Sequence, residues 1–372
     1  MRIKELTGQI DKLIPRRWAI SSDNVGQLVS TDDEDVTAVV LSLDLTSKAV
    51  DIATNIGANL IITHHPAIPQ PVSSLDSSSP QTKELIRCIR CGINVYSAHT
   101  NLDAAPDGVS FRLAKKLGLS PTSFLVPCPG EKLFKLTVYV PEEHLKRFSE
   151  GMFSLGVGKL GRYSETSFFS KGTGTFKPER GAHPFTGEIG RRSETSEYRW
   201  ESILKERDIP KAIEGIKKFH PYEEPAYDII SLLQKEEKAG FGCICQLQKS
   251  VSFSQFAARI HNTIPTAYFV LSGDTKKEIA RVAILGGSAN SLITELFSSG
   301  VDCLITGEVG YHNILLLLSA GINCIQIGHF ASEIWGLEKL NEIIREIDPG
   351  IQITTNFEDS PYTKVMEEIY GR

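Results

Sequence analysis

Histidines and acidic residues that could bind a metal occur at widely separated positions in this sequence, each after a short apolar run. Imidazole nitrogens and carboxylate oxygens are suitable ligands for divalent transition metals. If the fold gathers these side chains, their types predict a metal site at which chemistry takes place. The candidate ligands are His64, His65, Asp103, His329 and Glu333.

The apolar runs before these residues are typical of buried strands. The histidine pair directly follows the run 60–63, and Asp103 lies in the loop after the run 93–96. His329 follows the run 323–327 after a single residue, Gly328. In open sheets of parallel strands, functional residues lie just beyond the carboxyl ends of the strands. Because these segments come from both halves of the chain, we expect a site between two α/β lobes.

The adjacent histidines favour two ions over one. Successive side chains of an extended chain point to opposite sides, so His64 and His65 would bind neighbouring ions more readily than a shared one. Asp103 and Glu333 could bridge the ions or balance their charge. The pattern therefore favours a dinuclear site with the ions about 3.5–4 Å apart. For any one of these residues alone, an ordinary polar role in a loop is the alternative.

Three more residues are candidates for orienting the ligands, for carrying protons or for catalysis. His99 lies in the same loop as Asp103. Glu308 and His312 lie four residues apart, after the apolar run 301–305. The alternative is that all three are hydrogen-bonded loop and helix-cap residues. The sequence identifies no general base.

Three further motifs have a structural interpretation beside a chemical one. The adjacent glycines in 285–290 could bind a phosphate or carboxylate through backbone N–H groups, although a tight turn needs glycines too. The basic cluster 171–177, with the arginines that follow it, could meet an anionic ligand, although a solvated hairpin is the alternative. Cys88 and Cys91 have no second pair, which favours buried helix cysteines over zinc ligands.

The composition limits the class of protein. The chain has 372 residues, of which 41% are hydrophobic and 23% charged, as in a soluble protein of two or three domains. Its formal net charge of −5 argues against a broad nucleic-acid-binding surface. Its start shows no signal peptide, and no apolar stretch is long enough to span a membrane. Seven cysteines favour a reducing cytoplasm over a disulfide scaffold.

Alternating strand-like and helix-like runs predict an α/β fold of two lobes with an insert. We expect the first lobe over residues 1–127 and the second over 239–372, each with a mainly parallel sheet. Residues 128–238 have the order strand, helix, polar hairpin, helix, strand, which is typical of a small α+β domain. The three prolines and the glycine in 121–130 predict a linker.

Several of these segments carry a family resemblance when they are taken together. They are Asp23–Gly26, Leu43–Thr46, Ile62–Pro66, Ala98–Ala105, Ile305–Glu308, Tyr311-His312 and Gly328–Glu333. The chain resembles the type 2 GTP cyclohydrolase I homologues, also called the Nif-three-like family. Long bacterial members carry an insert that resembles PII and CutA proteins, and the segments Lys171–Pro178 and His220–Tyr227 match it.

The resemblance implies two α/β lobes around a central cleft with a dinuclear metal site, whose ligands are the five residues given above. It also implies a ring-shaped homohexamer with a ferredoxin-like insert facing the openings. The family name implies a metal-dependent hydrolase, cyclohydrolase-like or a phosphoesterase, acting on a nucleotide-like or related small substrate. The alternative is a metal-organised binding or regulatory hexamer without turnover, with the insert as sensor or partner module. The ligand types fit Zn, Mn, Fe, Co or Ni.

The chain departs from the usual residues of the family at a few positions. Glu308 stands where an Asp is common, and Gly310 where a Lys is common. The residues after Gly26 and the segment 241–245 also differ. None of these departures touches the five candidate ligands.

Overall fold

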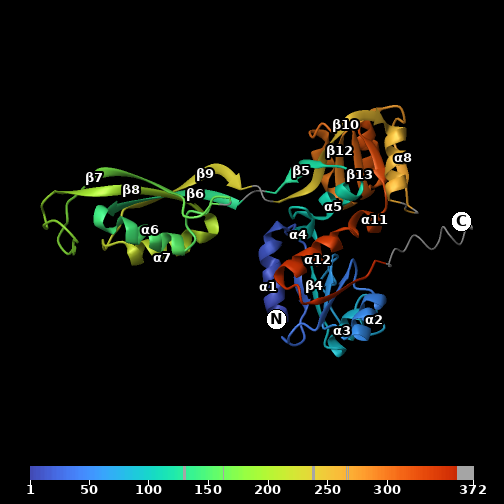
Figure 1. Ribbon diagram of the computed structural model, residues 1–372, viewed down its shortest axis with the longest axis horizontal. Helices are drawn as coiled ribbons and strands as arrows, with labels where there is room; N and C mark the ends of the chain where they lie inside the picture. The colour runs from blue at the N-terminus through green and yellow to red at the C-terminus, as the bar shows by residue number, and fades with distance from the viewer. Residues whose placement is uncertain (129–130, 162, 237–238, 265, 267, 358–372) are drawn as a thin grey trace, which may run out of the picture. The chain divides into compact units, whose positions relative to one another are not determined.

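The computed structural model describes residues 1–372 except 129–130, 162, 237–238, 265, 267 and 358–372 (Figure 1). The chain forms two compact units, one from residues 1–128 and 238–372 and the other from residues 129–237. The first unit contains a five-stranded and a six-stranded sheet, and the second contains a four-stranded sheet. The protein is therefore mixed α/β, as the alternating sequence pattern predicts.

In the five-stranded sheet, every neighbouring pair of strands is parallel except the pair that includes the edge strand β1. The three central strands are buried along their whole length, which is why apolar residues occupy successive positions in them without alternation. The last described strand of the chain, β15, joins this sheet beside β2. In sheet order, the strands are β1 (Gly26–Val29), β4 (Asn94–Ser97), β3 (Leu60–Thr63), β2 (Ala38–Ser42) and β15 (Gln352–Thr355).

Alternate residues of these strands pack against helices on the two faces of the sheet. Leu41 and Ile62 pack with α1 and α12, while Val40 and Ile61 pack with α2 and α3. The helix α2 begins where the side chain of its N-cap Thr46 accepts a hydrogen bond from the amide of Ala49. The bounds of these helices are α1 (Ile3–Leu13), α2 (Ser47–Ile56), α3 (Lys83–Arg90) and α12 (Gly336–Ile347).

The six-stranded sheet has a parallel centre, β12-β13-β14, with antiparallel strands on both sides. Ile284 and Ile305 pack with α5 and α8 on one face, and Ala283 and Leu304 pack with α9 and α10 on the other. In sheet order, the strands are β11 (Val270–Ser272), β14 (Asn323–Gln326), β13 (Cys303–Glu308), β12 (Glu278–Ser288), β10 (Gly240–Ser252) and β5 (Pro121–Pro127). The helices are α5 (Val109–Lys116), α8 (Phe253–Thr263), α9 (Ile293–Phe297) and α10 (Tyr311–Ser319).

The linker predicted over residues 121–130 is wrong for its first seven residues, which form β5 and pair with β10. Proline lacks the N–H that a central strand needs, but β5 lies at the edge of its sheet, where this loss is tolerated. Pro121 and Pro127 are therefore compatible with a strand. Residues 129–130 of the predicted linker lie outside the described residues.

The second unit has an antiparallel sheet of order β7-β8-β6-β9 and two helices. The core contains Trp200, Phe148 and Met152, which pack where α6 and α7 cover the sheet. Its elements are β6 (Glu131–Pro141), α6 (Leu145–Ser154), β7 (Ser167–Phe176), β8 (Ser193–Lys205), α7 (Ile209–Phe219) and β9 (Tyr227–Glu236), in the order predicted from the sequence. None of the helices in the described part of the chain has the length and apolar character of a membrane span.

Candidate metal centre

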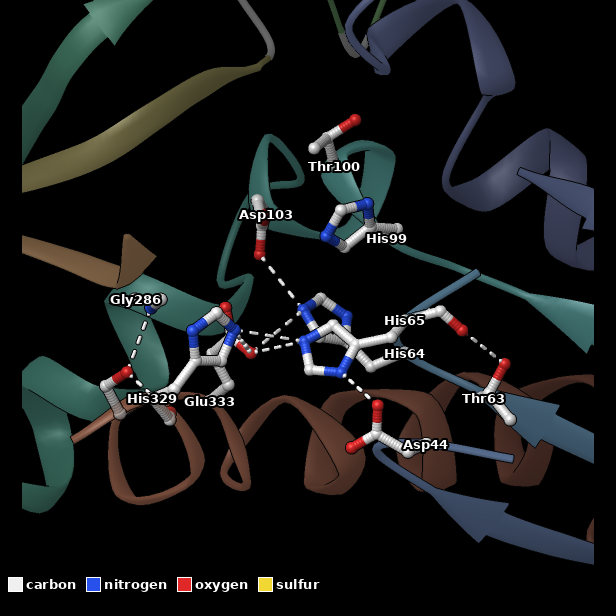
Figure 2. A network of polar contacts seen from close by, with 12 residues as sticks. Asp44, Thr63, His64, His65, His99, Thr100, Asp103, Gly286, His329 and Glu333 are labelled. Carbon is white, nitrogen blue, oxygen red and sulfur yellow. Dashed lines mark hydrogen bonds and ion pairs between the residues drawn. The ribbon is translucent and has the colours of Figure 1, made fainter. Parts of the chain in front are cut away.

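The five candidate ligands lie together at the carboxyl ends of parallel strands from both sheets of the first unit (Figure 2). His64 and His65 directly follow β3. Asp103 ends α4 (Thr100–Asp103), which begins three residues after β4, and α11 (His329–Glu333) begins three residues after β14. The fold therefore brings these distant residues together at the ends of strands, where the apolar runs of the sequence predict them.

His64 is buried and fixed in one tautomer. Its Nδ1 lies 2.8 Å from the backbone oxygen of Ala98, which can only accept, so Nδ1 donates and Nε2 carries the lone pair. Nε2 lies 3.6 Å from Oδ1 of Asp103, and in the described part of the chain neither of these two buried atoms has a hydrogen-bond partner. An unpaired polar atom of this kind is costly in a protein interior, which indicates that a ligand belongs between them.

The imidazoles of His65 and His329 are oriented in the same way, each by a carboxylate. Nδ1 of His65 lies 2.8 Å from Oδ1 of Asp44, and Nδ1 of His329 lies 2.8 Å from Oε1 of Glu308. This arrangement, in which a carboxylate holds the outer nitrogen of a histidine, is the usual support of a metal-binding imidazole. Both Nε2 atoms then turn towards Glu333. The Oε2 atom of Glu333 lies 2.8 Å from Nε2 of His65 and 3.0 Å from Nε2 of His329.

The Nε2 atoms of His65 and His329 lie only 3.2 Å apart. With both Nδ1 atoms donating to carboxylates, neutral imidazoles would bring two nitrogen lone pairs and the oxygen of Glu333 together without a proton between them. Such a group of acceptors is stable only around a cation, which is either a proton on an imidazole or a metal ion. The donor set therefore fits a divalent metal, and it contains no cysteine that would restrict the choice of metal.

The pKa values of the clustered side chains reflect the opposing effects of burial and of their hydrogen bonds to one another. Burial lowers the pKa of His65, but its hydrogen bonds with Asp44 and Glu333 outweigh this effect and raise it to about 10. The hydrogen bond with Glu333 raises the pKa of His329 to about 9. Burial opposes ionisation of Glu333, but the three imidazoles hold its pKa well below the usual range. Without a metal, this cluster therefore holds protons in its place.

A fourth imidazole, that of His99, borders the cluster. Its ring centre lies 5.2 Å from that of His64 and 5.6 Å from that of His65. Its Nδ1 lies 2.9 Å from Oδ1 of Asp23, whose other oxygen accepts a hydrogen bond from the amide of Thr100. Burial raises the pKa of Asp23, but these hydrogen bonds outweigh it and lower it to about 2, so Asp23 stays charged.

Among the described residues, two overlapping sets of three side chains could each hold a metal ion, because the ligand atoms within each set lie within 4.8 Å of one another. Both sets contain His65. One set consists of His64, His65 and His99, and the other of His65, His329 and Glu333. Asp103 approaches the first set through His64. That these residues bind a metal stays a prediction, but their geometry is suited to it.

Glycines allow the carboxylate of Glu333 to reach the histidines. A Cβ atom on Gly287 would lie 2.1 Å from Oε1 of Glu333, and the φ of Gly287 is +64°, which side chains rarely adopt. The amide of Gly287 also donates to Oγ of Ser332, which lies next to Glu333. The glycine junction 285–290, considered as a possible anion-binding turn, therefore positions α11.

The other candidates from the sequence have different outcomes. Glu308 orients His329, and His99 lies beside the cluster, as described above. His312 lies exposed on α10, where its ring packs on Tyr311, and none of its described contacts joins it to the cluster. Asp44 and Asp23 were not assigned a role from the sequence, although each lies in a segment that carries the family resemblance.

The fold and the site define an α/β protein with a histidine and carboxylate cluster that is suited to metal binding. Residues 1–361 match the family described as Duf34/NIF3 (NGG1p interacting factor 3), and the chain belongs to this family.

Named relatives and solved structures cover nearly the whole chain. A protein of Halalkalibacterium halodurans named GTP cyclohydrolase 1 type 2 homolog is 36% identical over 89% of this chain and 90% of its own. The Bacillus subtilis protein of the same name is 31% identical over 97% of this chain and 99% of its own. A crystal structure of a Bacillus cereus protein related to NIF3 is 30% identical and superposes with a TM-score of 0.82 over 98% of both chains.

We expect metal binding to stabilise the protein and to depend on His329. After chelation, adding Zn²⁺, Mn²⁺ or Co²⁺ at about 100 times its dissociation constant should raise the free energy of unfolding by about 2.7 kcal/mol. The His329→Ala variant should lose most of this gain, measured by thermal melting. His312→Ala is the matched control, because His312 also lies in the first turn of a helix but away from the cluster. An unchanged gain in His329→Ala would contradict the metal site.

A second prediction concerns Gly287. The Gly287→Ala variant should be destabilised by about 1–3 kcal/mol from its φ and by a further contact with Glu333, and it should also lose metal affinity. Gly321→Ala is the control, because Gly321 has a φ of +75° with nothing within 4 Å of an added Cβ. Denaturant unfolding and metal titration measure both effects. Equal losses in the two variants would show that the contact with Glu333 has no role.

Proposed function

We propose that this protein is a dinuclear metal-dependent hydrolase that acts on a nucleotide-like or related small substrate. The observation that carries the proposal is the position of one oxygen of Glu333. Its Oε2 lies 2.8 Å from Nε2 of His65, 3.0 Å from that of His329 and 3.8 Å from that of His64. A carboxylate oxygen among three imidazole nitrogens that approach from two sides is suited to bridge two ions.

The side chains divide into two sets around this carboxylate. His65 and His329 would hold one ion together with Glu333. His64 and Asp103, whose facing atoms have no hydrogen-bond partner among the described residues, would hold the second. The adjacent histidines thus serve different ions, as the opposite directions of successive side chains in an extended segment suggest.

When bound, a pair of divalent ions lowers the pKa of water and polarises a carbonyl, amidine or phosphoryl group. His99 is the residue of this chain best placed to move a proton. Because its Nδ1 donates to Asp23, its Nε2 can accept a proton and return it to a leaving group. The carboxylate of Asp23 keeps the ring in this tautomer and orientation.

The relatives are named as homologues of a GTP cyclohydrolase, which supports a cyclohydrolase-like activity. A homologue's name does not identify the substrate. We further propose that the second unit is a PII/CutA-like insert, on the basis of its order of strands and helices. From the family resemblance we propose a central cleft between the lobes, a ring-shaped homohexamer and a cytoplasmic location. Mass measurements of the native assembly test the hexamer.

The proposal predicts two metal ions per subunit and a division of roles among the histidines. Elemental analysis after reconstitution should find both ions in the wild type and a loss in His65→Ala and Glu333→Ala. With the metal that binds, hydrolysis of a panel of nucleotides and phosphoesters should vanish in both variants. The His99→Ala variant should keep its metal but lose about 10²- to 10⁴-fold in kcat, since it lacks the proton carrier.

His312→Ala serves as the control and should keep both metal and rate. Activity that survives in both His65→Ala and Glu333→Ala would contradict the mechanism. If the metal-loaded wild type turns over none of the substrates, and chelation breaks the native assembly into smaller species, the protein is a metal-organised binding or regulatory assembly instead.

A further inference from the structure

The second unit has a cavity of about 530 Å³ that is independent of the histidine cluster. Most of its walls come from two segments that the proposed function does not use, the glycine-rich end of β7 with the residues after it and the segment 222–226 before β9. The backbone amide of His183 donates to Oε1 of Glu223 and ties the loop after β7 to the second segment. The end of β7 and the segment 222–226, which are far apart in the sequence, thus form one pocket.

A buried carboxylate, that of Glu197 on β8, lies at this cavity. Glu197 is only 8% exposed, and its Oε1 accepts a hydrogen bond of 2.9 Å from the hydroxyl of Tyr222. Within the described part of the chain, no basic side chain forms an ion pair with Glu197. A buried carboxylate with one neutral donor is poorly compensated, so a positively charged group is expected beside it.

Glycines open the space in front of this carboxylate. Gly172 pairs with Glu197 across the ladder between β7 and β8, and Gly174 follows two residues later on the same face. A Cβ atom on Gly174 would lie 2.1 Å from Oε2 of Glu197, whereas one on Gly172 would meet nothing within 4 Å. Oε2 of Glu197 therefore points towards β7 at Gly174. The space that a side chain at position 172 would occupy is open and belongs to the cavity.

Three aromatic rings stand at the same cavity. Tyr222 lies between Phe176, at a ring-centre distance of 6.4 Å, and Phe185, at 5.9 Å. His220 holds this wall in place, because its Nε2 donates to the carbonyl of Tyr139 and its Nδ1 accepts from the amide of Tyr222. Aromatic faces attract cations, and a carboxylate beside them strengthens this preference.

Two of the three basic residues that line the cavity, Lys171 and Arg199, form ion pairs with acidic residues other than Glu197. Nζ of Lys171 lies 2.6 Å from Oε2 of Glu142, and the guanidinium of Arg199 lies 2.6 Å from Oε1 of Glu201. The exposed Lys177 lies at the cavity as well, together with the exposed acidic residues Glu223 and Glu224. The anionic ligand considered from the basic sequence cluster is therefore less suited to this pocket than a cation.

We propose that this cavity binds a small organic cation, whose protonated amine or guanidinium group meets Glu197 while its apolar part lies against Phe176, Phe185 and Tyr222. The cavity volume suits a metabolite-sized molecule. This site is separate from the proposed hydrolase chemistry and does not depend on it.

Calorimetric titration of the full-length protein with agmatine and n-butylguanidinium tests the proposal. Both cations should bind to the wild type, and the neutral analogue n-butylurea should not. The Glu197→Gln variant should weaken the binding about 10- to 100-fold, because Gln keeps the acceptor for Tyr222 but removes the charge. Gly172→Leu should abolish binding by filling the cavity, since an added side chain at this position meets no atom.

Glu194→Gln, an exposed position on the same strand, is the matched control and should bind like the wild type. Thermal melting and the metal-induced stabilisation should be unchanged in all three variants, which separates loss of the pocket from loss of folding. The proposal is overturned if neither cation binds to the wild type, if n-butylurea binds equally well, or if Glu197→Gln binds as tightly as Glu194→Gln.

Discussion

The described site depends on one constraint, the burial of the Glu333 carboxylate among imidazole nitrogens that all carry lone pairs. The outer nitrogens of His64, His65 and His329 are committed to Ala98, Asp44 and Glu308, so their inner nitrogens cannot all act as donors without extra protons. A cation relieves this conflict, which makes the site suited to a metal ion. The rest of the first unit keeps these acceptors together against their mutual repulsion.

The fold meets this constraint by bringing strand ends of two different sheets together. His64 and His65 are attached to the five-stranded sheet, while His329 and Glu333 follow the central strands of the six-stranded one. The chain then returns to the first sheet through α12 and β15, which pack on and pair with β2. The helix α11 is therefore connected at its beginning to β14 of the six-stranded sheet and at its end to α12, which packs on the five-stranded sheet.

The sequence predicts well the strands beside this site and the position of the five candidate ligands at the ends of strands, because both follow local rules. The buried parallel strands carry apolar residues at successive positions, and 60–63 is a strand in the structure over the same residues. The pairs His65–Asp44 and His99–Asp23 could not be predicted, since their partners are 21 and 76 residues apart and only the tertiary fold sets their distances. The strand β5 was hidden by its prolines, whose cost depends on an edge position that the sequence alone does not reveal.

The buried carboxylates of Glu333 and Glu197 differ in how their charge is balanced. Glu333 faces three imidazoles that can carry protons, whereas Glu197 receives a hydrogen bond from one phenol. Burial raises the pKa of Tyr222 to about 12, so this phenol keeps its proton and donates without neutralising the charge. Glycines at 172 and 174 leave the approach to Glu197 open instead of covering it with side chains. A fold that only needed stability would gain from an apolar residue at position 197, and the retained charge is therefore best explained by a ligand that balances it.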